Sequence, residues 1–154
     1  MKNMALLIDT NIIMDVILKR EPFFEKSDYV YKICRDKKAS GYLAAHTITN
    51  FFYSSRKYFS VDERRGIVLR LFKIFKVIPI DEEKLLAATQ NYEFKDFEDC
   101  LQVECAKTVE ADYIITRDKN DFQESEIEAI TPEEFCKMFE DSEDEDSEDN
   151  EDNE

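Results

Sequence analysis

The chain has 154 residues, 43% of them hydrophobic and 12% aromatic, which suits one domain with a hydrophobic core and excludes a wholly disordered chain. No apolar run approaches the roughly 18 residues that span a membrane, and the N-terminal segment lacks the apolar core and cleavage site of a signal peptide. The net charge of −15 is uneven: residues 140–154 hold eleven acids and no base, and without them 21 basic and 25 acidic residues leave a net charge of −4.

The acidic segment differs from the rest of the chain. Its like charges repel one another and it has no apolar side chain to bury, so we expect a disordered tail over residues 140–154 and a folded domain over residues 1–139. Two roles stay open for the tail. It could be a solubilising extension, or a polyanion that competes with nucleic acid for a basic surface.

Four cysteines are spread along the chain without a CxxC pair and without a histidine at metal-ligand spacing. This pattern favours reduced thiols and therefore a cytoplasmic protein. The cysteines are Cys34, Cys100, Cys105 and Cys136.

Short apolar runs alternate with segments of helical spacing along the chain. The runs predict strands over residues 4–9, 41–46, 76–81, 112–116 and 127–130, and Pro79 in the third indicates a strand end or an edge position. Helices are predicted over residues 11–19, from 22 to about 38, after a cap at Thr47 or Thr49, after a cap at Asp62, over 82–92 and 96–109, and from a capping box that begins at Thr131.

Alternating helices and continuous apolar strands predict an α/β fold with a parallel sheet covered on both faces. The chain has only two glycines, Gly41 and Gly66, so it lacks the glycine-rich loop of Rossmann and P-loop proteins.

Several acids follow strands whose carboxyl ends should meet at one edge of such a sheet. The first strand leads into Asp9 and Asn11, and the strand "DYIIT" leads into Thr116, Asp118 and Asp121. The helix before that strand carries Asp96 and Asp99, which are three residues apart and share a face.

These carboxylates have no base nearby in the sequence, and together they would repel one another. A hard divalent cation such as Mg²⁺ or Mn²⁺ removes the repulsion, and can activate water and stabilise the leaving oxygen of a phosphodiester. The alternative is that these acids are helix caps and surface turns. Asp9 fits that alternative least well, because it ends the most apolar strand in the chain.

The segments "LLIDTNIIMDVILKREP", "AHTITNFFYSSRK", "DFEDCLQVECAKTVEADYIITRDKNDF" and "TPEEFCKMF" resemble the PIN domain, the metal-dependent ribonuclease fold of VapC-type toxins. The resemblance extends over residues 4–139, and the first and third segments are specific only in combination. It implies a three-layer sandwich with a central parallel sheet of about 4–5 strands flanked by helices. It also implies a homodimer that cleaves RNA with Mg²⁺ or Mn²⁺ and, for a toxin, an antitoxin protein as partner.

The resemblance assigns roles to the acids residue by residue. Asp9 resembles the first metal-binding aspartate of the family, Asp99 the acid that opens the helix before the fourth strand, and Asp118 the acid or amide after the family's threonine, here Thr116. The predicted metal ligands are therefore Asp9, Asp99 and either Asp118 or Asp121. Asn11 and Asp96 are assigned supporting places beside them.

One position departs from the family pattern. Many PIN domains have a glutamate in the helix after the second strand, and here Asn50 stands at that position. An amide offers a carbonyl oxygen but no charge. The departure leaves open a catalytically weak PIN domain that acts as an RNA- or protein-binding module.

Residues 56–76 carry seven bases and two acids, a local excess of positive charge in an acidic chain. With aromatic residues beside them, these bases could guide an RNA backbone, or they could form an ordinary solvated helix face. The residues assigned to RNA binding are Arg56, Lys57, Arg64, Arg65 and, from the strand end at Thr116, Arg117.

A haloacid-dehalogenase-like phosphatase is a second enzyme class with an aspartate after its first strand. Its chemistry needs a second acid two residues later, where this chain has Asn11. His46, the only histidine in the chain, is expected to have a structural, hydrogen-bonding role.

Overall fold

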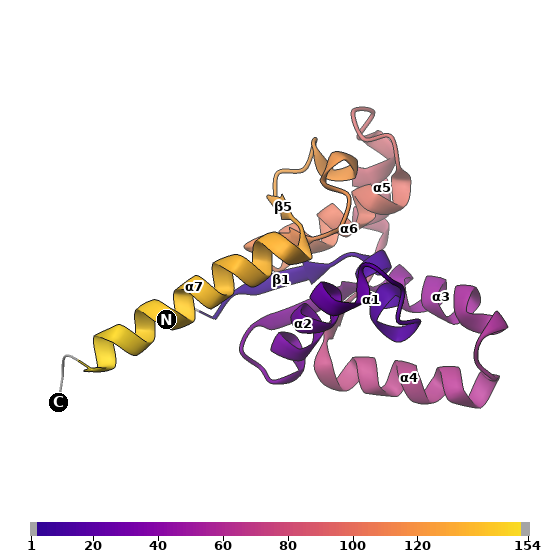
Figure 1. Ribbon diagram of the computed structural model, residues 1–154. Helices are drawn as coiled ribbons and strands as arrows, with labels where there is room; N and C mark the ends of the chain where they lie inside the picture. Colours follow the sequence, from indigo (N-terminus) through magenta and orange to yellow (C-terminus); the bar gives the residue numbers. More distant parts are fainter. Residues whose placement is uncertain (1–2, 152–154) are drawn as a thin grey trace.

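The computed structural model describes residues 3–151, with side chains described as far as Ser147. Its centre is a five-stranded sheet in the order β3-β2-β1-β4-β5, and all four neighbouring pairs are parallel (Figure 1). The predicted parallel α/β fold is therefore confirmed. The strands are β1 (Ala5–Ile8), β2 (Ser40–Ala44), β3 (Lys76–Ile78), β4 (Tyr113–Ile115) and β5 (Ala129–Ile130).

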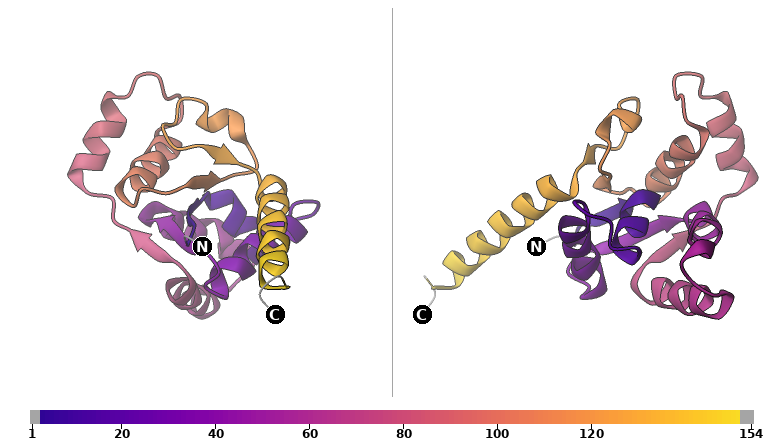
Figure 2. Two further views of the ribbon diagram at one scale, coloured as in Figure 1. Left: turned by 90° about the vertical axis from the view of Figure 1, so that its left-hand side faces the viewer. Right: turned by 45° about the vertical axis from the view of Figure 1, so that its right-hand side comes forward.

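Helices cover both faces of the sheet and complete the three layers. Helices α1, α2, α3, α4 and α7 pack on one face, whereas α5 and α6 lie over the other (Figures 1 and 2). The helices are α1 (Thr10–Ile17), α2 (Phe24–Arg35), α3 (Ala45–Ser54), α4 (Val61–Ile74), α5 (Glu82–Gln90), α6 (Phe97–Thr108) and α7 (Pro132–Glu151), with short 3₁₀ turns η1 (Ser55–Lys57) and η2 (Lys119–Phe122).

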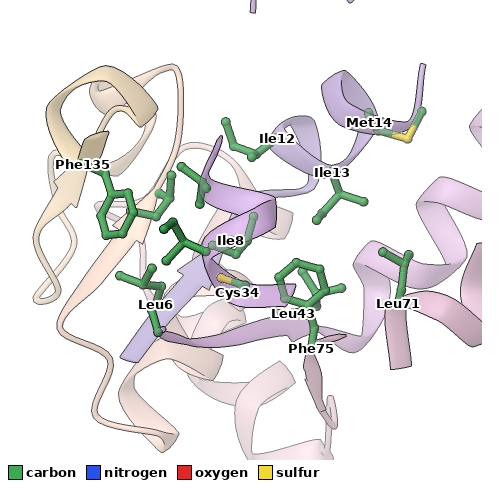
Figure 3. Close-up of a cluster of buried hydrophobic side chains, with 14 of the residues drawn as sticks. Leu6, Ile8, Ile12, Ile13, Met14, Cys34, Leu43, Leu71, Phe75 and Phe135 are labelled. Carbon is green, nitrogen blue, oxygen red and sulfur yellow. The ribbon is translucent and has the colours of Figure 1, made fainter. Parts of the chain in front are cut away.

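Strand β1 is buried on both faces, as its continuous apolar run predicts. Leu6 and Ile8 point into the larger core under α1, α2 and α7 (Figure 3). Leu7 points into the other core, under α6. All three side chains are at most 1% exposed. Burial of each stabilises the fold by about 1.5–3 kcal/mol relative to exposure, which fixes the register of the central strand and the position of the residue after it.

Two helix starts test the predicted caps. Helix α4 is capped by Ser60 rather than by Asp62: the Ser60 hydroxyl accepts from the Glu63 amide, and the Glu63 carboxylate accepts from the Ser60 amide. The prediction at Asp62 was wrong because Ser60 and Glu63 have the three-residue spacing of a capping box. The capping box of Thr131 and Glu134 is confirmed.

The start of α3 also differs from its prediction. The helix begins at Ala45, so neither Thr47 nor Thr49 is its cap. The fully buried Thr47 hydroxyl instead forms a hydrogen bond of 2.7 Å with the Thr10 hydroxyl, which ties α3 to the start of α1. His46 therefore lies in the first turn of a helix and not at the end of a strand.

Helix α7 continues across residue 140, where a disordered tail was expected to begin, and extends away from the body of the molecule (Figure 2). Phe135 and Phe139 anchor its first turns in the core, and Lys38 pairs with Glu143 at 3.5 Å. The helix thus has a packed first half that nucleates it and an exposed acidic second half. The division of the chain at residue 139 stays a prediction. No helix within residues 3–151 is long and apolar enough to cross a membrane.

Candidate active site

The acidic residues converge at the point where the chain connections of the sheet change direction. From β1 the chain moves to β2 on one side, whereas β4, on the other side of β1, connects outward to β5. Ligands of open α/β sheets bind outside the carboxyl ends of the strands at such a point. Asp9 directly follows β1 and Thr116 directly follows β4.

Asp9 is held at this edge by neutral donors. Its backbone amide donates to the Ile115 carbonyl at 3.0 Å, which extends the pairing of β1 with β4 by one residue. Its carboxylate accepts from the Thr116 hydroxyl at 2.9 Å and from the Gln102 side-chain amide at 3.0 Å. The side chain is 6% exposed, so two hydrogen bonds orient a buried carboxylate without neutralising it.

Asp99 reaches the same place from the opposite layer. It lies in the first turn of α6, whose N-cap is Asp96, and the Asp99 amide donates to the Asp96 carboxylate at 2.9 Å. Burial, followed by the nearby charges of Asp96, Asp9 and Asp121, raises the pKa of Asp99 to about 7. Near neutral pH the Asp99 carboxyl is therefore protonated in a large fraction of the molecules, and a bound cation would favour its ionised form.

A cavity of about 460 Å³ opens over these groups. Five carboxylates from three parts of the chain line it, together with one arginine, Arg20. The carboxylates are those of Asp9, Asp96, Glu98, Asp99 and Asp121. We refer to this space as the acidic cavity.

The loop after β4 contributes one of its two predicted acids to the acidic cavity. Asp121 lines it, and its pKa is raised by burial and by the charges of Asp118, Asp9 and Asp96. Asp118 does not line the cavity; its amide donates to the Thr116 hydroxyl at 3.1 Å, and its side chain lies against Asp121. Of the two acids that the sequence left open as the third metal ligand, Asp121 therefore has the more suitable place.

Asn50 lies in the wall of the acidic cavity and donates to the Glu98 carboxylate at 3.2 Å. The charge missing at position 50 is thus present 3.2 Å away, on α6 rather than on α3. Sequence reasoning did not single out Glu98. Its place in "KDFEDC", between Asp96 and Asp99, was the available signal.

Gln102 is the second residue that sequence reasoning missed. It is 1% exposed, and its side-chain amide also reaches Asp99 at 3.4 Å, so one amide links two carboxylates. Its Oε1 is buried without a hydrogen-bond partner among the described residues. The signal in the sequence was its spacing, because Gln102 stands one helical turn after Asp99.

His46 lines the acidic cavity as well, and burial lowers its pKa. The ring is therefore neutral at pH 7 and adds no charge to the cluster. Both ring nitrogens are buried without a well-formed hydrogen bond to any described residue, so the predicted hydrogen-bonding role was wrong.

The donor set suits a cation that keeps part of its water. Among the side chains that the structure describes, which end at Ser147, no three carboxylates, histidines or cysteines converge closely enough to hold one metal ion by themselves. Mg²⁺ is commonly bound through one or two carboxylates, with water and substrate phosphate completing its shell. Asp9 and Asp99, joined through Gln102 and carrying a raised pKa at Asp99, fit such a site.

Arg117, predicted to contact phosphate, has other partners. Its Nε lies 3.1 Å from the Asp15 carboxylate, and its guanidinium stacks over the Phe23 ring at 4.1 Å. It does not line the acidic cavity. A contact with phosphate stays a prediction for this residue.

The remaining residues assigned to RNA binding are Arg56, Lys57, Arg64 and Arg65, and three of these four line a groove between α3 and α4. Arg56, Arg64 and Arg65 line this groove of about 560 Å³, whose remaining walls are largely apolar. The Arg56 guanidinium lies over the Tyr53 ring at 3.9 Å, and that of Arg64 lies over the Phe52 ring at 4.4 Å. Lys57 does not line the groove, which we call the α3–α4 groove.

Comparison with known proteins agrees with this architecture. The sequence model of the PIN domain family matches residues 5–120. Ribonuclease VapC1 of Aquifex aeolicus is 27% identical over 145 residues, which cover 90% of this chain and 98% of the relative.

Among solved structures, a toxin–antitoxin complex from Klebsiella pneumoniae aligns with a TM-score of 0.62 at 21% identity, over 83% of this chain and 98% of that one. FitAcB from Neisseria gonorrhoeae aligns with a TM-score of 0.61 at 20% identity, over 82% and 97%. At these identities the structures show a shared fold.

Proposed function

Because the chain belongs to the PIN domain family, we propose that it is a metal-dependent endoribonuclease that hydrolyses RNA phosphodiester bonds. One observation carries the proposal. Asp9, Asp99 and Asp121 line one acidic cavity at the switch point of the sheet, where burial and the neighbouring acids raise the pKa of Asp99, and a divalent cation would counter that repulsion. The phosphatase alternative is set aside, because the family match extends over most of the chain.

Asp9 and Asp99 would hold Mg²⁺ or Mn²⁺, with Asp121 rather than Asp118 as the third acid. A bound divalent cation supplies positive charge to the phosphodiester transition state and acidifies water for attack. Gln102 and Thr116 fix the Asp9 carboxylate, and Asp96 fixes the first turn of α6 and with it Asp99. Asn11 and Asn50 line the cavity as neutral groups that can bind the substrate.

We also propose partners for the α3–α4 groove. Arginines over aromatic rings suit a nucleic-acid backbone, so Arg56, Lys57, Arg64 and Arg65 would guide RNA toward the acidic cavity. The toxin–antitoxin complex among its structural relatives suggests an antitoxin partner for this chain, and we propose that such a partner would cover this groove. A cytoplasmic homodimer is the form we propose for the free protein.

A catalytically weak binding module is the second candidate. Asn50, in place of the usual glutamate, favours it. The Glu98 carboxylate beside Asn50 favours an active enzyme, since the charge of the site is retained.

Cleavage of a panel of structured and single-stranded RNAs with Mn²⁺, Mg²⁺ or EDTA separates the two candidates, with Asp9→Asn as the variant. We expect cleavage that needs metal and that falls by roughly 1,000-fold or more in Asp9→Asn, because the variant loses several kcal/mol of charge stabilisation through the cation. Thermal unfolding of the metal-free variant should be little changed, since its hydrogen bonds are to neutral donors. A folded wild-type protein that cuts nothing with either metal supports the binding module instead.

A further inference from the structure

The end of helix α1 places an arginine in the acidic cavity. Lys19 adopts a positive φ of 51°, its amide donates to the Val16 carbonyl, and the Arg20 amide donates to the Asp15 carbonyl at 3.0 Å. These two hydrogen bonds form the Schellman arrangement that terminates a helix. The backbone of Arg20 is thereby fixed against the last turn of α1.

The side chain of Arg20 is directed by the same aspartate. Its Nη1 lies 3.6 Å from the Asp15 carboxylate, and Arg117 approaches that carboxylate from another side at 3.1 Å. Asp15 is fully buried, so its single charge lies between two guanidinium groups. Two cations share one anion, and the group as a whole keeps one positive charge.

That remaining charge is presented at Arg20. The Arg117 side chain is 29% exposed and is covered by the Phe23 ring, whereas the Arg20 side chain is 39% exposed and lines the acidic cavity. Arg20 is the only lysine or arginine among the described residues of that lining. A guanidinium has a fork of donors that matches phosphate, and it is held here without being fully neutralised.

We propose that Arg20, held by Asp15, binds a phosphate of the RNA strand in the acidic cavity. The inference rests on the proposed function for its substrate class. The arginine counters the repulsion between the carboxylates and the RNA backbone, and it sets the position of the strand relative to Asp9 and Asp99. Asp15 is a positioning residue, because it acts through Arg20.

The competing explanation is that Arg20 only offsets the negative charge of the cavity. In that case its removal would tighten metal binding and leave the affinity for RNA unchanged at saturating metal. Phosphate binding predicts the opposite: weaker RNA binding and a smaller salt dependence, because one fewer counterion is released.

The experiment compares Arg20→Gln, Arg20→Lys and a matched control, Arg35→Gln. Arg35 also pairs with one aspartate, Asp36 at 3.0 Å, and it is exposed at the end of α2. The KM and kcat for a single-stranded RNA are measured with saturating Mg²⁺. Binding of the same fluorescent RNA is measured by anisotropy over a salt series, with each substitution placed in the Asp9→Asn background.

Arg20→Gln should weaken RNA binding and raise KM by about tenfold, the loss expected for one charge-assisted contact. The slope of log affinity against log salt should fall in magnitude by about 0.7. Arg20→Lys should recover part of the loss, since it keeps the charge without the fork. Arg35→Gln should match the parent protein.

The outcomes separate this inference from the proposed function. Wild-type cleavage with unchanged KM, binding and salt slope in Arg20→Gln overturns the inference and leaves the nuclease standing. RNA binding without cleavage, weakened by Arg20→Gln, supports the inference and overturns the nuclease. A wild-type protein that neither binds nor cleaves RNA overturns both.

Discussion

The two ends of helix α1 each place a buried aspartate, and the two carboxylates have opposite surroundings. Asp9, before the helix, is 6% exposed and accepts hydrogen bonds from neutral groups at the floor of the acidic cavity. Asp15, in its last turn, is fully buried and faces two arginines. The two carboxylates are six residues apart in the sequence. Neutral donors orient that of Asp9, whereas the charges of two arginines oppose that of Asp15.

This difference shows how one short segment of the chain supplies a carboxylate for a cation, at Asp9, and a buried ion pair that fixes the neighbouring arginines, at Asp15. The Asp9 carboxylate is held by neutral donors and has room for a cation beside it, whereas the Asp15 carboxylate lies within ion-pair distance of two guanidinium groups, at 3.6 and 3.1 Å. Burial raises the pKa of Asp15, and Arg117 and Arg20 act against that rise. If the two roles are separate, substitutions at Asp15 should change mainly stability, and substitutions around Asp9 should change mainly metal binding and cleavage.

The largest expected effect on stability is that of Asp15→Asn. The substitution keeps the shape of the side chain and leaves two guanidinium groups without their shared anion. We expect a loss of about 3 kcal/mol in the free energy of unfolding, toward the low end for a broken buried pair because both arginines are partly exposed. Urea denaturation measures it.

Asp36→Asn is the matched control for this change, because Asp36 pairs with Arg35 at the surface. It should shift the urea midpoint little. If Asp15→Asn shifts the urea midpoint as little as Asp36→Asn does, the buried Asp15 carboxylate does not stabilise the fold through its arginines. The two ends of α1 would then not differ in the way described.

The next effect concerns the link between the two acids of the site. Gln102→Leu fills the same space but cannot donate to Asp9 or Asp99. We expect a loss of about 10- to 100-fold in metal affinity or cleavage rate, the usual effect of removing a group that orients metal ligands. Titration of Mn²⁺ and initial cleavage rates measure it.

A useful comparison for Gln102→Leu is Gln123→Leu, since Gln123 is exposed and donates only to Asn120. This variant should retain activity. Equal activity in both variants would mean that Asp9 and Asp99 need no shared donor.

The smallest expected effect is the change in the stability of the metal-free protein with pH. The pKa of Asp99 is about 7 in the folded protein and 3.8 ordinarily, so between these values the folded state binds more protons than the unfolded state. The contribution of Asp99 to stability without metal is therefore full below about pH 4 and is lost as the pH rises to about 7. The melting temperature of the metal-free protein should fall over this range less steeply in Asp99→Asn.

Metal binding should show the reverse trend, because a cation replaces the proton on Asp99. The apparent affinity for Mg²⁺ should be about tenfold higher at pH 8 than at pH 6. Calorimetric titrations at the two pH values measure it. An affinity that does not change with pH would place the cation away from Asp99.

Much of the fold could be read from the sequence, because its signals are local. The apolar runs at β1 and β4 predicted a buried parallel sheet, and the polar residues after them predicted which edge would carry the site. The errors were local as well. The cap of α4 was misplaced by two residues, and the start of α3 was set too late.

By itself, the sequence determined the family and the order of strands and helices along the chain. It also indicated that Asp9, Asp99 and Asp121 would lie near one another, since strand direction and helix spacing carry that information. Only the tertiary structure decided which groups share a partner. Glu98 lies beside Asn50, Gln102 joins two acids, and Arg20 rather than Arg117 enters the acidic cavity. These contacts depend on how α1, α3 and α6 pack against one another across distances of up to 93 residues in the chain, which no local pattern records.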